Sequence, residues 1–260
     1  MNVSSVISVV VAKGWRVFTR PFELNIVGIR SANLRSNRFD DVMCVFWKDD
    51  AGTWQGRQYA CTTDPGTFWL ENPMQPQGTA FVCEGQFIDC WSQGLHRNQY
   101  KALVQRGPMN IVRGLARAEG IDWGNAKVIR GVYGIDLHRA LRSGTSYTVD
   151  EHSAGCQVLA EAEDFAELMQ LADIHASRYG NHFSYSLVDY RLLRRSQNLT
   201  LGLTALFIGS LLALLATQFF DEDIGSAGKP GNLKGPEPDA LKPKPKKRKP
   251  KKNVNSKATI

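Results

Sequence analysis

One segment divides this chain into a part that can fold in water and a part that cannot. It begins at Leu199, ends at Phe220 and carries no charged residue over 22 positions. As an α-helix it is about 33 Å long, which matches the hydrocarbon core of a bilayer. A buried core helix is the alternative, but the run has no polar face and a polar tail follows it. We therefore predict a transmembrane anchor over residues 191–222.

The residues after the anchor, 223–260, are rich in Gly, Pro and Lys and bury almost nothing, so we expect disorder. Eight of the eleven positions from Lys242 to Lys252 are Lys or Arg. This cluster suits anionic lipid headgroups or nucleic-acid phosphate, and the alternative is a solubilising tail. Residues 221–260 hold eleven Lys/Arg against five Asp/Glu, so +6 of the net charge of +7 lies there. The preceding domain is nearly neutral.

The charges around the anchor give two opposite predictions of orientation. Three arginines between positions 191 and 195 precede it and three acidic residues at 221–223 follow it, which favours a cytoplasmic N-terminal domain. The basic cluster at 242–252 favours the reverse. Residues 5–12 are apolar but short, with no preceding Lys or Arg, so they do not form a convincing signal peptide. The sequence predicts a single-pass membrane protein and leaves its orientation open.

Short runs of β-branched and aromatic residues, separated by Gly, Asp and Asn, fill the region 23–190. We predict strands at 25–30, 41–47, 58–62, 80–83, 101–105, 110–113, 128–129, 131–136 and 183–188. One amphipathic helix is expected around Phe165, Leu168 and Ala172, capped by Gly180. The leader, 1–22, has a Val-rich run that fits a helix or a strand. The predicted domain is mainly β, a sandwich or a barrel-like sheet, with one or two helices.

A histidine and a cysteine form the candidate chemical site. His138 is followed by a turn-rich loop and then by Cys156, and Gly155 lets the backbone beside the sulfur turn sharply. A thiol with an imidazole base is the minimum for nucleophilic attack on a carbonyl. The alternative is that Cys156 is a buried apolar residue and His138 an ordinary histidine.

The remaining histidines and cysteines give weaker signals. His152 is four residues before Cys156 and is the other candidate imidazole, whereas His96 is expected to lie in a loop as an ordinary polar residue. Four further cysteines stand at positions 44, 61, 83 and 90, and we expect free, buried thiols, the alternative being a Cys83–Cys90 bridge within one hairpin. No Cys-x-x-Cys pair or zinc-ligand spacing is present in the sequence, so no metal or cofactor is expected.

Residues 134–138 read Gly-Ile-Asp-Leu-His and residues 153–157 read Ser-Ala-Gly-Cys-Gln. Together they resemble the signature of the L,D-transpeptidase (YkuD-type) family, an Ile-His-Gly histidine followed by Ser-His-Gly-Cys-x-Arg. Residues from about 25 to 188 are more closely similar to uncharacterised phage and prophage proteins. Three positions depart from the family pattern: Arg139 replaces a glycine, Ala154 a histidine and Val158 an arginine.

The resemblance implies a β-rich fold in which Cys156 is the nucleophile, reacting as a thiolate, and His138 is its base. Gly155 and the Cys156 N–H would form the oxyanion hole, and Ser153 would orient His138 or the substrate. The implied substrates are peptide stems of peptidoglycan, and a thioester acyl-enzyme would pass to water or to a peptide amine.

The resemblance also bears on where the protein works. A peptidoglycan enzyme with this anchor is expected in the membrane of a host cell or a virion, with its catalytic domain facing the cell wall. The rival interpretation is a non-enzymatic membrane structural or wall-binding protein, for example in a virion, whose basic tail contacts nucleic acid or capsid. The two interpretations differ in the reactivity of Cys156.

Overall fold

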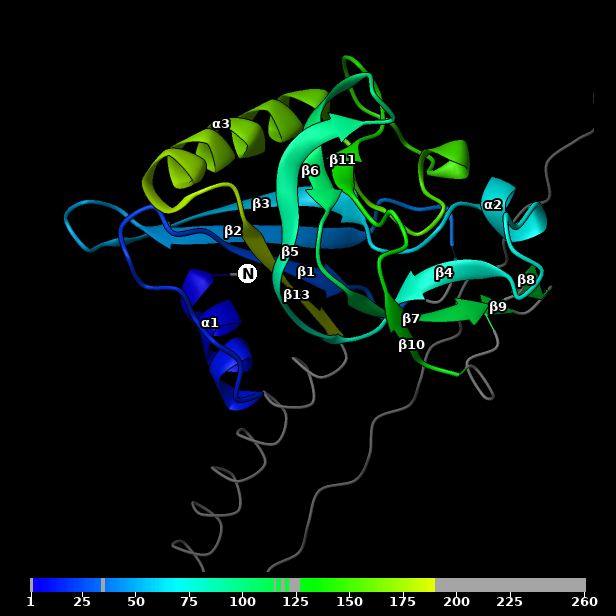
Figure 1. Ribbon diagram of the computed structural model, residues 1–260, viewed down its shortest axis with the longest axis horizontal. Helices are drawn as coiled ribbons and strands as arrows, with labels where there is room; N and C mark the ends of the chain where they lie inside the picture. The colour runs from blue at the N-terminus through cyan, green and yellow to red at the C-terminus, as the bar shows by residue number, and fades with distance from the viewer. Residues whose placement is uncertain (1, 34–35, 115, 118–119, 122–126, 190–260) are drawn as a thin grey trace, which may run out of the picture. The chain divides into compact units, whose positions relative to one another are not determined.

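The computed structural model describes residues 2–33, 36–114, 116–117, 120–121 and 127–189 (Figure 1). The chain divides into two compact units, Met1–Phe207 and Ile208–Ile260, and every described residue lies in the first. The anchor and the basic tail predicted from the sequence therefore lie outside the described residues. Within the described part, no helix is long and apolar enough to cross a membrane.

Eight strands close into a barrel, which leaves no unpaired edge around the sheet. In spatial order they are β1 (Asn25–Arg30), β13 (Phe183–Asp189), β5 (Gly85–His96), β6 (Tyr100–Gln105), β11 (Leu137–Arg139), β12 (Gln157–Leu159), β3 (Trp54–Thr62) and β2 (Asp41–Lys48). Two neighbouring pairs, β1–β13 and β11–β12, are parallel, and the other pairs are antiparallel.

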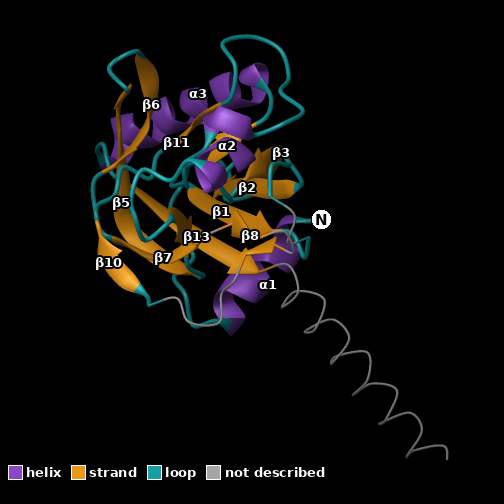
Figure 2. Cartoon of the chain, turned by 90° about the vertical axis from the view of Figure 1, so that its right-hand side faces the viewer, coloured by secondary structure: helices purple, strands orange, loops and turns teal. Residues whose placement is uncertain are grey.

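Two smaller sheets and four helical segments complete the described structure (Figures 1 and 2). One sheet has the order β10 (Ile129–Gly131), β7 (Met109–Gly114) and β4 (Thr79–Val82), and the other pairs β8 (Ala116–Arg117) with β9 (Gly120–Ile121). The helices are α1 (Val3–Ala12), α2 (Thr67–Glu71), α3 (Ala162–Tyr179) and the short 3-10 segment η1 (Asp150–His152). The smaller sheets and α2 lie together at one side of the barrel.

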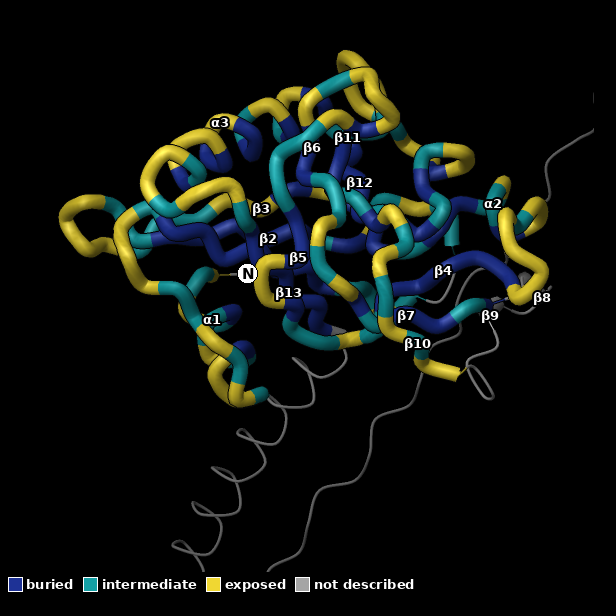
Figure 3. Tube along the Cα trace, viewed as in Figure 1, coloured by how far each residue is buried: buried dark blue, intermediate teal, exposed yellow. Residues whose placement is uncertain are grey.

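The main core is formed by the barrel interior and the apolar face of α3. Phe165, Leu168 and Ala172 are buried in it, as the helical periodicity predicts. Gly180 ends the helix with φ +93°, and its N–H donates to the Ala176 carbonyl. Figure 3 shows the resulting division, with buried residues along the barrel strands and exposed residues on the outer side of α3 and on the loops. This core fixes the barrel strands that carry the site.

The Val-rich run of the leader forms α1. Asn2 caps it by accepting the N–H of Ser5, and Val6 and Val10 are buried against the outer side of the barrel in a second apolar cluster. Valine has a modest helix propensity, but burying this stripe outweighs that cost.

The prediction of a mainly β domain is confirmed, but several of its details differ, and the short strands β8, β9, β11 and β12 were not predicted. The described part has three α-helices instead of one or two, because α2 is too short to show a periodicity. The longest strand, β5, was not predicted, because a bulge at Asp89 (φ +50°) shifts its register and breaks the alternation of apolar residues. Residues 132–136 are not a strand, because several of their backbone groups bond side chains instead.

Two side chains bond that segment. Gln105 Oε1 accepts the N–H groups of Tyr133 and Ile135, each at 2.8 Å, and the Trp91 indole N–H donates to the Ile135 carbonyl at 2.7 Å. The prediction of free cysteines is confirmed, since all five are unpaired. Cys83 and Cys156 are, however, only partly buried.

Candidate active site

Parallel pairing of β11 with β12 brings the predicted histidine and cysteine into one site. His138 lies in the middle of β11, and Cys156 directly precedes β12. The register pairs Leu137 with Gln157, which places Cys156 level with Asp136. Accordingly, the Gln157 N–H donates to the Asp136 carbonyl at 2.9 Å, and the Asp136 N–H lies 3.4 Å from the Cys156 sulfur. Residues 18 positions apart in sequence thus meet at one end of two neighbouring strands.

The Cys156 thiol donates to the Gly134 carbonyl, with Sγ 3.4 Å from the oxygen. Within the described residues it makes no hydrogen bond to an imidazole, an arrangement common in unliganded cysteine enzymes. Although Cys156 is only partly covered, the protein packed around its sulfur and the Asp136 carboxylate raise the thiol pKa to about 12. The sulfur of the unliganded site is therefore protonated at neutral pH, so a thiolate would have to form during the reaction.

His138 is buried, with 4% of its surface exposed. Its Nδ1 lies 2.9 Å from the Arg139 carbonyl, which can only accept, so Nδ1 carries the proton and Nε2 holds a free lone pair. Burial, and then the neighbouring His96, lower the His138 pKa to about 3. His138 is thus a neutral base at neutral pH.

Tyr100 closes this side of the site. Its hydroxyl donates to the Arg139 carbonyl at 3.2 Å and lies 3.3 Å from His138 Nδ1. The main-chain carbonyl of residue 139 orients the base, so the arginine at this position does not disturb that contact. The Arg139 guanidinium stands 4.3 Å from the centre of the Tyr100 ring, a cation–π contact.

Ser153 shapes the backbone around the cysteine. Its Oγ accepts the Gly155 N–H at 3.1 Å and donates to the Cys156 carbonyl at 2.8 Å. Ser153 therefore does not orient His138, which corrects that expectation. The Gly155 N–H is occupied, so the remaining candidate oxyanion donor of this loop is the Cys156 N–H, for which the described structure provides no acceptor.

The barrel interior supports the same loop from below. Tyr185, on β13, donates its hydroxyl to Gln157 Oε1 at 2.7 Å, and Gln157 Nε2 in turn reaches the Gly155 carbonyl at 3.3 Å. The Tyr185 hydroxyl has room because the neighbouring strand β1 has a glycine beneath it. A Cβ at Gly28 would lie 2.1 Å from the Tyr185 hydroxyl. The glutamine after the cysteine is therefore a support of the loop.

Gly155 is required for a geometric reason that a substitution can test. Its φ is +119°, and a Cβ there would lie 2.5 Å from the Ala80 carbonyl oxygen on β4. We expect Gly155→Ala to destabilise the domain by about 2–4 kcal/mol, combining left-handed strain with a backbone clash. The measurement is the free energy of unfolding from denaturant titration.

Gly144 is the matched control for this substitution. It also has a positive φ, +72°, but a Cβ there would meet no atom within 4 Å. Gly144→Ala should therefore cost only the strain, about 1–2 kcal/mol. Equal costs for the two substitutions would show that the contact with β4 does not hold the cysteine loop.

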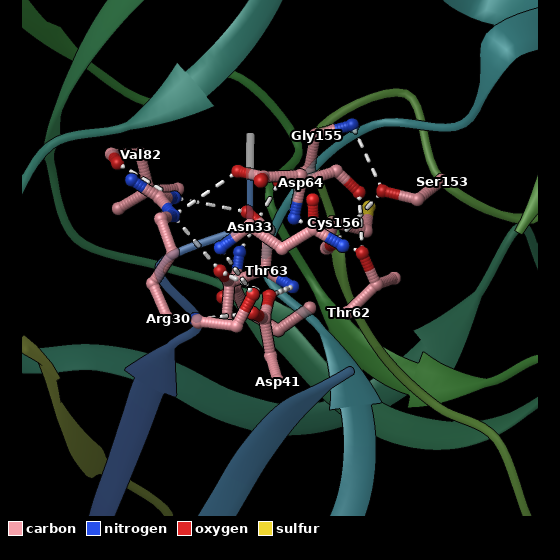
Figure 4. Close-up of polar contacts among 12 residues, drawn as sticks. Arg30, Asn33, Asp41, Thr62, Thr63, Asp64, Val82, Ser153, Gly155 and Cys156 are labelled. Atoms are coloured by element: carbon pink, nitrogen blue, oxygen red, sulfur yellow. Dashed lines mark hydrogen bonds and ion pairs between the residues drawn. The ribbon is translucent and has the colours of Figure 1, made fainter. Parts of the chain in front are cut away.

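A buried cluster of charges lies beneath this loop (Figure 4). Arg30, at the end of β1, donates to the Thr63 hydroxyl, the Thr63 carbonyl and the Val82 carbonyl, and its Nε lies 3.1 Å from Asp64 Oδ1. Asp41 accepts the Thr63 N–H and hydroxyl, each at 2.7 Å. The cluster therefore ties the barrel to the smaller sheet directly below the loop.

Two buried carboxylates lie in this cluster, and Arg30 forms an ion pair with one of them, Asp64. Burial, and then the charge of Asp64, raise the pKa of Asp41 to about 6, and burial raises the pKa of Asp64 as well. Asp64 Oδ1 is also the one buried side-chain polar atom of the described residues that forms no hydrogen bond. Near pH 6 the cluster therefore takes up a proton, chiefly on Asp41.

A raised folded-state pKa makes stability depend on pH with a definite sign. The unfolded chain releases the Asp41 proton near pH 3.8 and the folded protein releases it near pH 6. The stabilisation of the fold by the protonated Asp41 is therefore complete below about pH 4 and is lost as the pH rises through 6. The loss is about 3 kcal/mol. A ¹³C titration of the Asp41 carboxyl should show a midpoint near 6.

The control for this titration is Asp50, an exposed carboxylate whose pKa is lowered by its hydrogen bond to Arg178. Asp50 should titrate below its usual range in the same sample. A midpoint for Asp41 at or below 4 would mean that its three hydrogen-bond donors outweigh its burial.

The structure also brings together residues that sequence reasoning did not assign to the site. His96, the last residue of β5, stacks on His138 and bonds Asp136, and Tyr100 begins the next strand. His152 lies on η1 and forms no hydrogen bond with Cys156 within the described residues. Asp136 lies two positions before His138, which is the spacing that places both side chains on one face of a strand. That spacing is the one signal that could have identified it.

Comparison of the chain with protein-family models, with curated proteins and with solved structures finds no match. Within the described residues, no group of three or more His, Cys, Asp or Glu side chains is placed to hold a metal ion. The site therefore offers three groups for chemistry: a protonated thiol, a neutral imidazole with a free Nε2 and a backbone N–H.

Proposed function

We propose that this chain is a membrane-anchored, cysteine-dependent enzyme that acts on peptide crosslinks of the cell wall, and that a phage or prophage encodes it. One observation supports the proposal: parallel pairing of β11 with β12 brings Cys156 within two register positions of His138, whose Nδ1 is held by the Arg139 carbonyl. That bond leaves Nε2 as a base. The L,D-transpeptidase-like pattern of residues 134–138 and 153–156 adds the substrate class.

The proposed reaction begins as His138 Nε2 takes the Cys156 proton while the sulfur attacks the carbonyl carbon of a peptide bond. The Cys156 N–H stabilises the oxyanion, and His138 then returns the proton to the leaving amine. A thioester acyl-enzyme results. Water releases it in a hydrolase, and a second peptide amine releases it in a transpeptidase. Because the resting thiol is protonated, attack and proton transfer occur together.

The test of this function uses the full chain in detergent with a defined mixture of muropeptides, and mass spectrometry of the products. Crosslinked dimers converted to monomers with added water would indicate hydrolysis. New dimers with loss of a terminal residue would indicate transpeptidation. Unchanged muropeptides at stoichiometric enzyme would refute the proposal.

We also propose that residues 199–220 anchor the protein in a membrane of the host cell or the virion, with the catalytic domain facing the wall. Support comes from the uncharged run and the basic cluster at 242–252. Each Lys or Arg near an anionic surface contributes about 1 kcal/mol.

The anchor proposal predicts a clear difference between two forms of the protein. The full chain should float with anionic lipid vesicles at both about 50 and 200 mM salt, because apolar insertion is not screened. A synthetic peptide of residues 240–257 should bind the vesicles, or DNA, only at the lower salt. If the full chain no longer floats with the vesicles at the higher salt, its membrane binding is purely electrostatic and residues 199–220 are not an anchor.

A second candidate function rests on the same thiol. The bond from Cys156 to the Gly134 carbonyl and the raised thiol pKa are also what an inert cysteine would show. On that interpretation the protein is a non-enzymatic wall-binding or virion membrane protein, whose tail contacts nucleic acid or capsid. It would retain affinity for peptidoglycan after Cys156→Ala, whereas the enzyme interpretation requires loss of product formation.

A further inference from the structure

A second imidazole lies against the face of the base. The ring centres of His96 and His138 are 4.0 Å apart and their planes differ by 20°, so the two rings stack. His96 is 7% exposed and is the last residue of β5, which pairs with β6 in a hairpin. Two buried, stacked rings from different strands, β5 and β11, restrict each other's rotation. The plane of His138 is therefore set partly by His96.

Asp136 fixes His96 in turn. His96 Nδ1 lies 2.7 Å from Asp136 Oδ2, and Asp136 Oδ1 accepts the Gln105 N–H at 2.8 Å. Both carboxylate oxygens thus have a partner, one from a side chain and one from the backbone of β6. Because Asp136 also donates its own N–H to the Cys156 sulfur, its carboxylate belongs to the same residue that touches the thiol.

The groups that face these two rings are few. Asp136 is the nearby negative charge, Arg97 and Arg139 are the positive charges, and Tyr100 is the neutral polar neighbour. An uncompensated carboxylate beside the sulfur opposes formation of a thiolate. In this structure the Asp136 carboxylate has this effect on Cys156 even though its Oδ2 is hydrogen-bonded to His96 Nδ1.

We propose that His96 and Asp136 are a positioning pair for the Cys156–His138 centre: the His96 ring holds the plane of His138, and its Nδ1–H bonds the Asp136 carboxylate and so weakens the effect of that charge on the thiol. This rests on the proposed function for the role of Cys156 as nucleophile. Neither His96 nor Asp136 exchanges a proton with the substrate. In the chemical step the Sγ–H bond breaks, its proton goes to His138 Nε2, and the sulfur electron pair forms the bond to carbon.

Two substitutions of His96 separate the two parts of the role. His96→Phe keeps a flat ring against His138 and removes the bond to Asp136. His96→Asn keeps an N–H for Asp136 and removes the ring. His182→Phe is the matched control, because His182 forms the same kind of pair with Asp89, 3.0 Å apart, where no group of the site is involved.

The first readout needs no substrate: the rate at which iodoacetamide alkylates Cys156 in the full chain, followed by mass spectrometry of its peptide between about pH 7 and 10. His96→Phe should slow alkylation about tenfold at each pH, because the exposed carboxylate disfavours the thiolate. His96→Asn and His182→Phe should leave this curve in place. If His96→Phe behaves as His182→Phe does, the proposal is overturned.

The second readout is muropeptide turnover. His96→Asn should lower kcat about 10-fold to 100-fold with little change in KM, as expected when a base loses its orientation. An unchanged kcat would overturn the role of the ring. If His96→Phe does not fold, Asp136→Asn is the alternative test, because it removes the negative charge near the thiol. It should speed alkylation of Cys156 about tenfold, the opposite of the effect of His96→Phe. An unchanged alkylation rate in Asp136→Asn would also overturn the proposal. If wild type has no turnover, the proposed function fails, and the alkylation curves still decide the positioning pair.

Discussion

Replacing Cys156 with serine should abolish product formation from muropeptides while leaving the domain folded. In the described site, the Cys156 sulfur is the group proposed to form the covalent intermediate. A serine hydroxyl in its place is less nucleophilic and ionises far less readily than a thiol. A loss of more than about 10³-fold in kcat is expected, as for removal of the nucleophile in other acyl-transfer enzymes. The fold should survive, because Ser153 holds the loop through backbone atoms of residues 155 and 156.

Cys83→Ser is the matched control, since Cys83 is the other partly buried free thiol. Its hydroxyl should leave both turnover and melting temperature close to wild type. If Cys156→Ser retained more than about a tenth of wild-type turnover, Cys156 would not be the nucleophile. If both variants lost activity together with stability, the thiols would have packing roles instead.

Much of the fold was predictable from the sequence, because burial imposes periodicity. The α3 face around Phe165 and Leu168 and the strands at 25–30 and 41–47 follow that periodicity and were predicted closely. β5 was not, because the bulge at Asp89 interrupts it. Residues 132–136 have strand-like composition, but their N–H groups bond the side chain of Gln105, which no local pattern reveals.

The candidate site was predictable in its local part only. His138, Gly155 and Cys156 stand in a recognisable pattern, but the strands β11 and β12, whose pairing brings their segments together, were not predicted. The charge state could not be predicted, because it depends on burial and on Asp136, a neighbour through the register of β11 with β12. His96 reaches the site through pairing of β5 with β6, so its role depends on tertiary structure. The same holds for Ser153, whose contact is with the loop backbone.

Replacing His138 with alanine should lower kcat/KM by about 10²-fold to 10⁴-fold, the usual contribution of a positioned general base. Alanine leaves the Arg139 carbonyl and the Tyr100 hydroxyl hydrogen-bonded to each other, so the site should keep its shape. His152→Ala is the control on the neighbouring segment η1 and should be close to wild type. A loss with His152→Ala and not with His138→Ala would assign the base to the other imidazole.

The pH dependence of kcat/KM in wild type and in His138→Ala provides a sharper test of His138 as the base. Because the His138 pKa is held near 3, the base is neutral throughout the range from about pH 6 to 9, and wild-type kcat/KM should be nearly flat there. Without the base, only the thiolate fraction reacts, and the thiol pKa is about 12. The residual rate of His138→Ala should therefore rise about tenfold for each pH unit. A wild-type rate that rises equally steeply would mean that the thiol ionises before attack and that His138 takes no proton from it.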